Sequence, residues 1–131
     1  MTSFRSFAVP ALFAVACVLP LAGCKPEPAP VPPASQVADR EIEALLVAFE
    51  KSGLSFERNG EAYDNSKAGT WLRLKWSRRA KSIHSAEDFI QQVAHHSSET
   101  KQPYQVILAD GTKQASAGWF SARLEELRRQ R

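Results

Sequence analysis

The spacing of hydrophobic residues from Ser35 onward predicts a helix. Ile42, Leu45, Leu46 and Phe49 fall at i, i+3, i+4 and i+7, which is the spacing of one buried helical face. Glycine commonly follows the last turn of a helix, and Gly53 occupies that place here. We therefore expect an amphipathic helix that ends close to Gly53.

Two glycine-containing turns divide the polar stretches of the chain. Asn59-Gly60 lies between short extended pieces, and Asn-Gly is preferred in hairpin turns that need positive φ at both central residues. Asp110-Gly111 follows a β-branched and aromatic run at 104–108. We expect a small hairpin or bare turn at the first pair and a hairpin at the second.

Three further helices are expected, each with a polar residue able to cap its first turn. They begin near Asp64 to Ser66, at Ser85 and at Ser116. Their expected inward residues are Ala68, Trp71, Leu72, Leu74 and Trp76 in the first, Ala86, Phe89, Ile90 and Val93 in the second, and Trp119, Phe120, Leu124 and Leu127 in the third. The predicted fold is therefore a small single α+β domain over 36–131, with about four helices and two short β-hairpins.

The residues before this domain have the layout of a secretory signal peptide. Arg5 precedes an apolar run that contains Pro10 and Pro20 and ends in small residues. A transmembrane helix needs roughly 20 mostly apolar residues, so a permanent span is the less favoured interpretation. We predict a lipoprotein signal peptide at 1–23 and a proline-rich tether at 24–35.

Leu21-Ala22-Gly23-Cys24 resembles the lipobox of bacterial lipoproteins. The resemblance implies lipidation of Cys24, palmitate among its acyl chains, and cleavage before it. Several acyl chains on one residue make a stable membrane anchor. Lys25 follows the cysteine, which in enterobacteria-like lipoproteins implies sorting to the periplasmic face of the outer membrane. The alternative is an ordinary signal peptide with a chance cysteine.

Cysteine use and charge narrow the function classes. Cys17 lies in the predicted signal peptide and Cys24 would be lipidated, so the mature chain would keep no free thiol for catalysis or metal binding. The net charge of +3 is mild. An exported protein meets lipid head groups and wall polymers first, so we expect no nucleic-acid partner.

The ordered segments FERNGEAY, WLRLKW, SAEDFI, PYQVILADG and WFSARLEEL resemble a family of small exported bacterial proteins catalogued as a domain of unknown function. The family pattern falls on Arg58, Asn59, Gly60, Tyr63, Lys75, Ser97, Ser98, Pro103, Tyr104, Asp110, Gly111 and Trp119. This chain departs from it with Trp71-Leu72 in place of His-Leu, and at Lys101 or Gln102 in place of a glycine. The resemblance implies the fold and export and assigns no activity.

Lys75 lies in the middle of an otherwise apolar helical side. A lysine there must extend its ammonium to solvent, pair with a carboxylate, or lie in a cleft with a lowered pKa. Glu57, Glu61 and Asp64 are close enough in sequence to be its partner. A structural ion pair is the favoured interpretation over a functional lysine.

Other polar groups have simpler explanations. His95 and His96 are helical neighbours that point about 100° apart, so we expect no metal site and no cofactor. Ser97-Ser98 lies at a helix end, where serine hydroxyls bond backbone groups. Trp71, Trp76 and Trp119 are expected mainly to pack in the core, with sugar stacking as the alternative.

Three functions remain open. The favoured one is a lipid-anchored, periplasm-facing binding or accessory domain of the cell envelope, with an envelope protein or peptidoglycan as partner and no chemistry of its own. The second is a small wall-active hydrolase using Arg58, Tyr63, Lys75 and a carboxylate. The third is a structural envelope protein that contacts another subunit. The candidate binding residues are Arg58, Asn59, Tyr63, Lys75, Tyr104 and Trp119.

Overall fold

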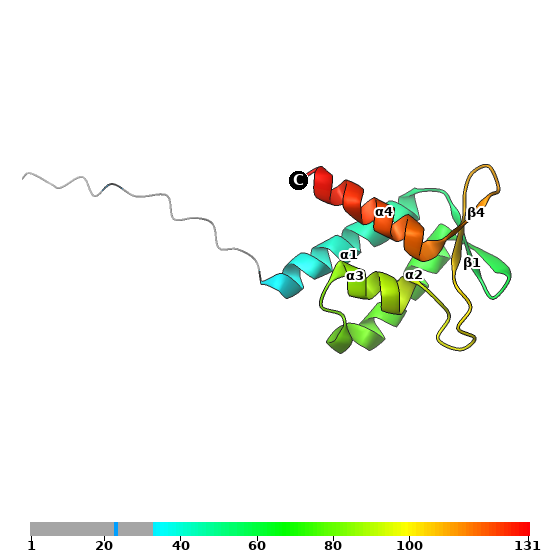
Figure 1. The fold of residues 1–131 in the computed structure, drawn as a ribbon, viewed down its shortest axis with the longest axis horizontal. Coiled ribbons are helices and arrows are strands. Elements are labelled where there is room, and N and C mark those ends of the chain that lie inside the picture. The colour runs from blue at the N-terminus through cyan, green and yellow to red at the C-terminus, as the bar shows by residue number, and fades with distance from the viewer. Residues whose placement is uncertain (1–22, 24–32) are drawn as a thin grey trace, which may run out of the picture. The chain divides into compact units, whose positions relative to one another are not determined.

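The structure is a computed structural model that describes Gly23 and residues 33–131. In chain order its elements are α1 (Ala34–Lys51), β1 (Ser55–Arg58), β2 (Glu61–Asp64), α2 (Asn65–Arg79), the 3-10 turn η1 (Ala80–Ser82), α3 (Ala86–Phe89), the π-helical stretch η2 (Ile90–Ala94), β3 (Gln105–Ile107), β4 (Lys113–Ala115) and α4 (Ser116–Arg129). The predicted α+β class is confirmed (Figure 1). Cys24 and the predicted signal peptide up to residue 22 lie outside the described residues.

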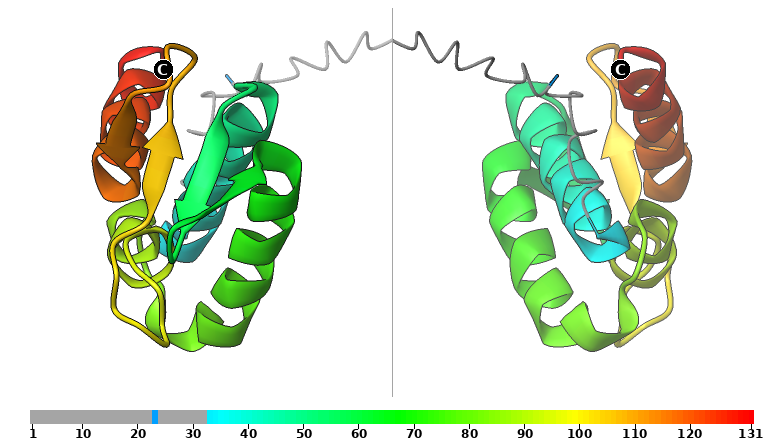
Figure 2. Two further views of the ribbon diagram at one scale, coloured as in Figure 1. Left: turned by 90° about the vertical axis from the view of Figure 1, so that its right-hand side faces the viewer. Right: turned by 90° about the vertical axis from the view of Figure 1, so that its left-hand side faces the viewer.

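The two predicted hairpins join into one antiparallel sheet with strand order β2-β1-β3-β4. The pairing of β1 with β3 links them, and it places Phe56 between Tyr63 and Val106 in one row across the sheet. Figures 1 and 2 show the sheet at one end of the helices. The strands are only three or four residues long. The face of the sheet that carries Phe56 and Val106 is buried and covers one end of the helical core.

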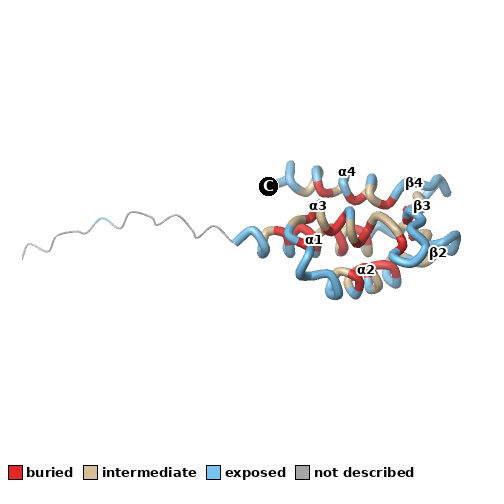
Figure 3. Tube along the Cα trace, turned by 60° about the horizontal axis from the view of Figure 1, so that its bottom comes forward, coloured by how far each residue is buried: buried red, intermediate tan, exposed pale blue. Residues whose placement is uncertain are grey.

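The core lies between the facing sides of the helices and the inner face of the sheet (Figure 3). All four predicted core residues of α1 are fully buried. The ring of Phe49 is central, with its centroid 5.8 Å from that of Phe56, 5.6 Å from Phe120 and 5.5 Å from Trp119. The contacts of Phe49 with Phe56 and Trp119 are edge-to-face and that with Phe120 is tilted, and such geometries favour a defined aromatic arrangement. One ring therefore holds α1, the sheet and α4 in register.

The local turn and cap predictions are mostly confirmed. Asn59 and Gly60 both have positive φ, 52° and 80°. The Asp64 carboxylate accepts from the Lys67 N–H at 2.7 Å, and the Ser85 hydroxyl accepts from the Asp88 N–H at 3.0 Å. These bonds satisfy N–H groups that lack a partner within the helix.

Two local predictions are wrong. Ser116 does not cap α4, because the cap position is Ala115 and the Ser116 hydroxyl is buried without a partner among the described residues. Leu74 is not an inward residue, since 48% of it is exposed. On that turn of α2 the buried residue is Lys75. Neighbouring residues of a helix point about 100° apart, so the side chain of Leu74 is turned outward.

Among the residues that the structure describes, no helix has the length and apolar character needed to cross a membrane.

Of the two positions at which the resemblance leads us to expect a glycine, Lys101 and Gln102, the first has a strained backbone. Lys101 has φ of +62°, a left-handed conformation that costs a side-chain-bearing residue roughly 1–2 kcal/mol. Glycine would remove this cost and so stabilise the folded chain. Part of that stabilisation is lost because glycine has more conformational freedom than lysine in the unfolded chain.

We therefore expect Lys101→Gly to raise the free energy of unfolding by about 0.5–1 kcal/mol in urea denaturation. Gln102→Gly is the control, because the positive φ of the loop falls on its neighbour. This control should be neutral or destabilising. Equal effects of the two variants would contradict the strain at Lys101.

Candidate functional site

The alternation of side chains along β1 turns Arg58 toward the helices. Successive residues of a strand point to opposite faces, so Arg58 lies on the same face as the fully buried Phe56. Glu57 lies on the other face and pairs with Lys113 at 2.6 Å. The last residue of the strand thus carries a guanidinium to the edge of the core.

A stripe along α2 faces this guanidinium. Lys67, Trp71, Lys75 and Arg78 are separated by four, four and three residues, a spacing that places them along one side of a helix. The stripe combines one large aromatic ring with three cationic side chains. It forms the second wall of a groove whose first wall is the β1–β2 hairpin.

The guanidinium of Arg58 stacks on Trp71, with 4.3 Å between the guanidinium carbon and the ring centroid. Its Nη2 donates to the Glu99 carboxylate at 3.3 Å. Its Nε is buried and has no partner among the described residues. Arg58 is therefore held in place by an aromatic surface, while its hydrogen-bonding capacity is only partly used.

Arg58 and Trp71 separate two hollows. The hairpin pocket, of about 300 Å³, is lined by Phe56, Arg58, Tyr63, Lys67, Ala68 and Trp71. The loop pocket, of about 120 Å³, lies toward the 97–103 loop and includes Arg58, Trp71, Lys75, Arg78, Ser98 and Glu99 in its lining. We call the two hollows together the groove; their linings share Arg58 and Trp71 and combine apolar side chains with the cations of Arg58, Lys67, Lys75 and Arg78.

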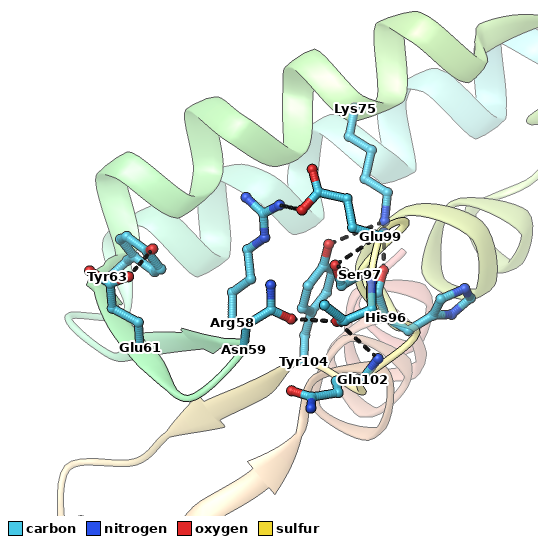
Figure 4. Close-up of polar contacts among 11 residues, drawn as sticks. Arg58, Asn59, Glu61, Tyr63, Lys75, His96, Ser97, Glu99, Gln102 and Tyr104 are labelled. Atoms are coloured by element: carbon cyan, nitrogen blue, oxygen red, sulfur yellow. Dashed lines mark hydrogen bonds and ion pairs between the residues drawn. The ribbon is translucent and has the colours of Figure 1, made fainter.

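Lys75 reaches inward from α2 toward the end of η2 (Figure 4). Its Nζ donates to the backbone carbonyls of Val93 at 2.9 Å and His96 at 2.7 Å, and to the Tyr104 hydroxyl at 3.3 Å. Carbonyls at the end of a helical segment lack partners within it. Lys75 supplies these partners and ties α2 to the segment before β3.

The expected carboxylate partners of Lys75 are wrong. Glu57 pairs with Lys113, Glu61 accepts from the Tyr63 hydroxyl at 2.7 Å, and Asp64 caps α2. Strand alternation turns Glu57 to the face opposite Arg58, whereas Glu61 lies on the Arg58 face but is bonded to Tyr63. Among the described residues Lys75 therefore lacks the favoured carboxylate ion pair, and its acceptors are neutral oxygens.

This environment shifts two pKa values. Burial, followed by the positive charges of Arg79, Arg58 and Lys101, lowers the pKa of Lys75 to about 8. The carbonyl bonds oppose that shift because they stabilise the ammonium. Burial raises the pKa of the Tyr104 hydroxyl to about 12, so this hydroxyl is neutral over the physiological range.

The remaining candidate residues are distributed unevenly. Tyr63 lines the hairpin pocket, with the Lys67 ammonium 5.1 Å from its ring centroid. Asn59 lies at the turn, where its side-chain oxygen accepts from the Thr100 hydroxyl at 2.6 Å. Tyr104 is 1% exposed, and its ring packs against that of Trp71 with 5.2 Å between the two ring centroids. The structure brings these three to one region.

Trp119 lies apart from this groove, on α4. Its ring centroid is 5.0 Å from that of Phe120, and it lines a separate hollow of about 320 Å³ beside Arg123. Trp76 lines another hollow, of about 830 Å³, between α1 and α2. All three tryptophans are partly buried against the core, which confirms their predicted packing role.

The Ser97 hydroxyl accepts from the backbone N–H groups of Glu99 at 3.3 Å and Thr100 at 3.4 Å. This confirms its predicted backbone role at the start of the loop. Among the described residues, no three histidine, cysteine or acidic side chains gather in a way that could hold a metal ion.

The sequence-based candidates omit Lys67, Trp71, Arg78 and Glu99. The spacing of the first three with Lys75 could have revealed their common helical side. The sequence gives no such signal for Glu99. It is 41 residues away from Arg58 in the chain, and only the folded path of the loop brings the two together.

Replacing Lys75 by methionine tests its structural role. Lys75→Met would leave two backbone carbonyls and a tyrosine hydroxyl without their donor. We expect a loss of about 2 kcal/mol in the free energy of unfolding at pH 7, measured by urea denaturation. Lys81→Met, at an exposed lysine of η1, is the control and should change stability little.

The same two proteins should also differ in pH dependence. The folded chain releases the Lys75 proton near pH 8, while the unfolded chain holds it to about 10.5. Between these values the unfolded state binds more protons, so this lysine makes stability rise with pH. The stability gap between wild type and Lys75→Met should therefore widen from pH 8 to 10. A constant gap would contradict the lowered pKa.

The comparisons with known proteins agree with the sequence-based family assignment in part. Residues 36–128 match a family described as "Family of unknown function (DUF5329)". The chain is also 42% identical over 67 residues to "Uncharacterized protein YfeK" of Salmonella typhimurium, a match that covers 50% of this chain and 56% of that protein. No solved structure matches the chain. Because the family match covers nearly the whole domain, the chain belongs to DUF5329, a family of unknown function.

Proposed function

We propose that this protein is a binding domain for a small anionic ligand, held at the periplasmic side of the bacterial cell envelope by a lipid on Cys24. The main support for this proposal is the position of Arg58. Its guanidinium stacks on Trp71 between two pockets, and its Nε has no partner among the described residues. An arginine fixed on an aromatic ring is already oriented for a carboxylate or phosphate.

The lining of the groove favours an amphipathic anion. Phe56, Ala68 and Trp71 give the hairpin pocket an apolar floor, while Arg58 and Lys67 supply positive charge. Small-ligand sites commonly combine apolar walls with a few convergent polar groups. The ligand would place a ring or short chain on this floor and its anionic group at Arg58.

A binding role agrees with the chemistry of Lys75. Its ammonium already donates to three oxygens, so it contributes charge to the loop pocket while its bonds hold the fold. A hydrolase would need a nucleophile beside a free base. The accessory binding function therefore explains the groove with fewer additional requirements.

The anchor is proposed from the sequence. The Leu21-Ala22-Gly23-Cys24 segment and the proline-rich residues that follow it resemble a lipoprotein leader and tether. About ten extended residues of polyproline type would hold the domain roughly 30 Å from the bilayer. Such a distance allows the groove to meet small solutes or wall fragments near the membrane.

Arg58→Gln tests the anion site. Benzoate and phenyl phosphate are the probes, and benzyl alcohol is the neutral comparison. We expect the anions to shift the Trp71 indole N–H resonance of the full chain in a nonionic maltoside detergent, and the alcohol to shift it far less. Arg58→Gln should weaken anion binding at least tenfold, because the stacked positive charge is lost.

Arg123→Gln is the matched control, since Arg123 lies beside Trp119 and also has a buried unpartnered Nε among the described residues. This variant should bind the anions as the wild type does. The proposed binding function is rejected when neither anion moves the Trp71 resonance.

Cys24→Ser tests the anchor. We expect cells fed radiolabelled palmitate to label the wild-type protein, and the serine variant to stay unlabelled because it lacks the acylated thiol. Membrane fractionation should recover the wild type with the outer membrane. Unlabelled wild-type protein would contradict the lipoprotein assignment while leaving the anion site untouched.

A further inference from the structure

The loop pocket carries more positive than negative charge. Arg58, Lys75 and Arg78 contribute three cations to its lining, and Glu99 contributes one carboxylate, so its lining residues sum to a formal charge of +2. Like charges held close together raise the free energy of the folded chain unless an anion offsets them. This pocket is therefore only partly neutralised by the residues that line it.

Glu99 occupies the position that a ligand anion would take. Its carboxylate contacts Nη2 of Arg58 at 3.3 Å while 76% of its side chain is exposed. Exposed ion pairs of this kind contribute little to stability, about 0–1 kcal/mol. The Glu99 carboxylate is thus a weakly held internal anion that a stronger one could replace.

The backbone beside Glu99 is anchored independently of that ion pair. The Thr100 hydroxyl donates to Asn59, and the Ser97 hydroxyl accepts from the Glu99 and Thr100 N–H groups. The contact at Asn59 joins the loop to the β1–β2 turn (Figure 4), and the two bonds to Ser97 lie within the loop. The Glu99 side chain can leave Arg58 by rotating about its own bonds while the loop keeps these anchors.

The size of the pocket limits the group that enters it. Its volume of about 120 Å³ is small beside the roughly 300–1,000 Å³ of complete ligand sites. It suits one compact oxyanion group. The hairpin pocket, on the other side of Arg58 and Trp71, would hold the body of the same ligand.

Charge distinguishes a phosphate ester from a carboxylate. A monocarboxylate would only take the place of Glu99 and would bring no more negative charge to the pocket than Glu99 already does. A phosphate monoester carries about −1.5 to −2 at pH 7 and has three acceptor oxygens. It would neutralise more of the charge of Arg58, Lys75 and Arg78 than Glu99 does.

We propose that the loop pocket binds the phosphate group of a small phosphate monoester, and that Glu99 is a resident carboxylate which this phosphate displaces from Arg58. This inference rests on the proposed anion-binding function and names its ligand class. The Arg58 guanidinium would bond the phosphate oxygens, Arg78 and Lys75 would add charge, and the Ser98 hydroxyl at the rim could donate to it. No covalent bond forms or breaks.

Glu99→Gln tests this displacement because it removes the competing charge and keeps the side-chain size. Phenyl phosphate and benzoate share one ring and differ in their anionic group. Their dissociation constants are measured at pH 7.5 from the Trp71 indole resonance of the full chain, in maltoside detergent, phosphate-free buffer and constant ionic strength. Glu126→Gln is the matched control, since Glu126 is a half-buried carboxylate paired with Arg123 at 2.6 Å, away from the loop pocket.

We expect the wild type to bind phenyl phosphate at least fivefold more tightly than benzoate. Glu99→Gln should tighten phenyl phosphate binding at least fivefold, and Glu126→Gln should stay within twofold of the wild type. Equal binding of the two probes would overturn the phosphate class and leave an anion site. An unchanged affinity in Glu99→Gln would overturn the displacement, and a Trp71 resonance unmoved by both probes would reject the anion site itself.

Discussion

The ammonium of Lys75 fixes the geometry on which the groove depends. It joins the middle of α2 to the carbonyls of Val93 and His96 and to the Tyr104 hydroxyl, three groups that are 18 to 29 residues away in the chain. These bonds set the distance between α2 and the segment leading into β3. Since Trp71 is on α2 and Tyr104 directly precedes β3, that distance also sets the aromatic contact beneath Arg58.

The cationic character of the groove follows from this arrangement. The bonds of Lys75 bring its positive charge close to Arg58 and Arg79, and these neighbours contribute to the lowered pKa of Lys75. Positive charges held near one another in a partly buried site attract anions. A chain with a net charge of only +3 can therefore present a strongly cationic local surface.

A second polar network holds the other end of the helices without forming a comparable site. Glu41 is 5% exposed and accepts from Arg128 at 2.8 Å, and Arg128 also donates to Glu87 at 2.6 Å. Arg128 lowers the pKa of both carboxyl groups. Charges of both signs compensate one another there, whereas cations outnumber the carboxylate in the lining of the loop pocket.

The sequence by itself determined the features that depend on neighbouring residues. Helical spacing identified the buried side of α1, Asn59-Gly60 identified a turn with two positive φ values, and Asp64 and Ser85 identified two helix caps. Each of these rests on contacts within a few residues, so the local sequence carries the whole signal. Helical spacing also placed Lys75 on an otherwise apolar side of its helix.

Only the tertiary structure decided which distant groups meet. It joined the two hairpins through β1 and β3, gave Lys75 backbone carbonyls as partners, and placed Glu99 opposite Arg58. It also separated Trp119 from the groove that holds Arg58, Tyr63 and Tyr104. Contacts between residues far apart in sequence depend on how the whole core packs. Hydrophobic periodicity reports only which side of one helix or strand is buried, so it cannot predict these contacts.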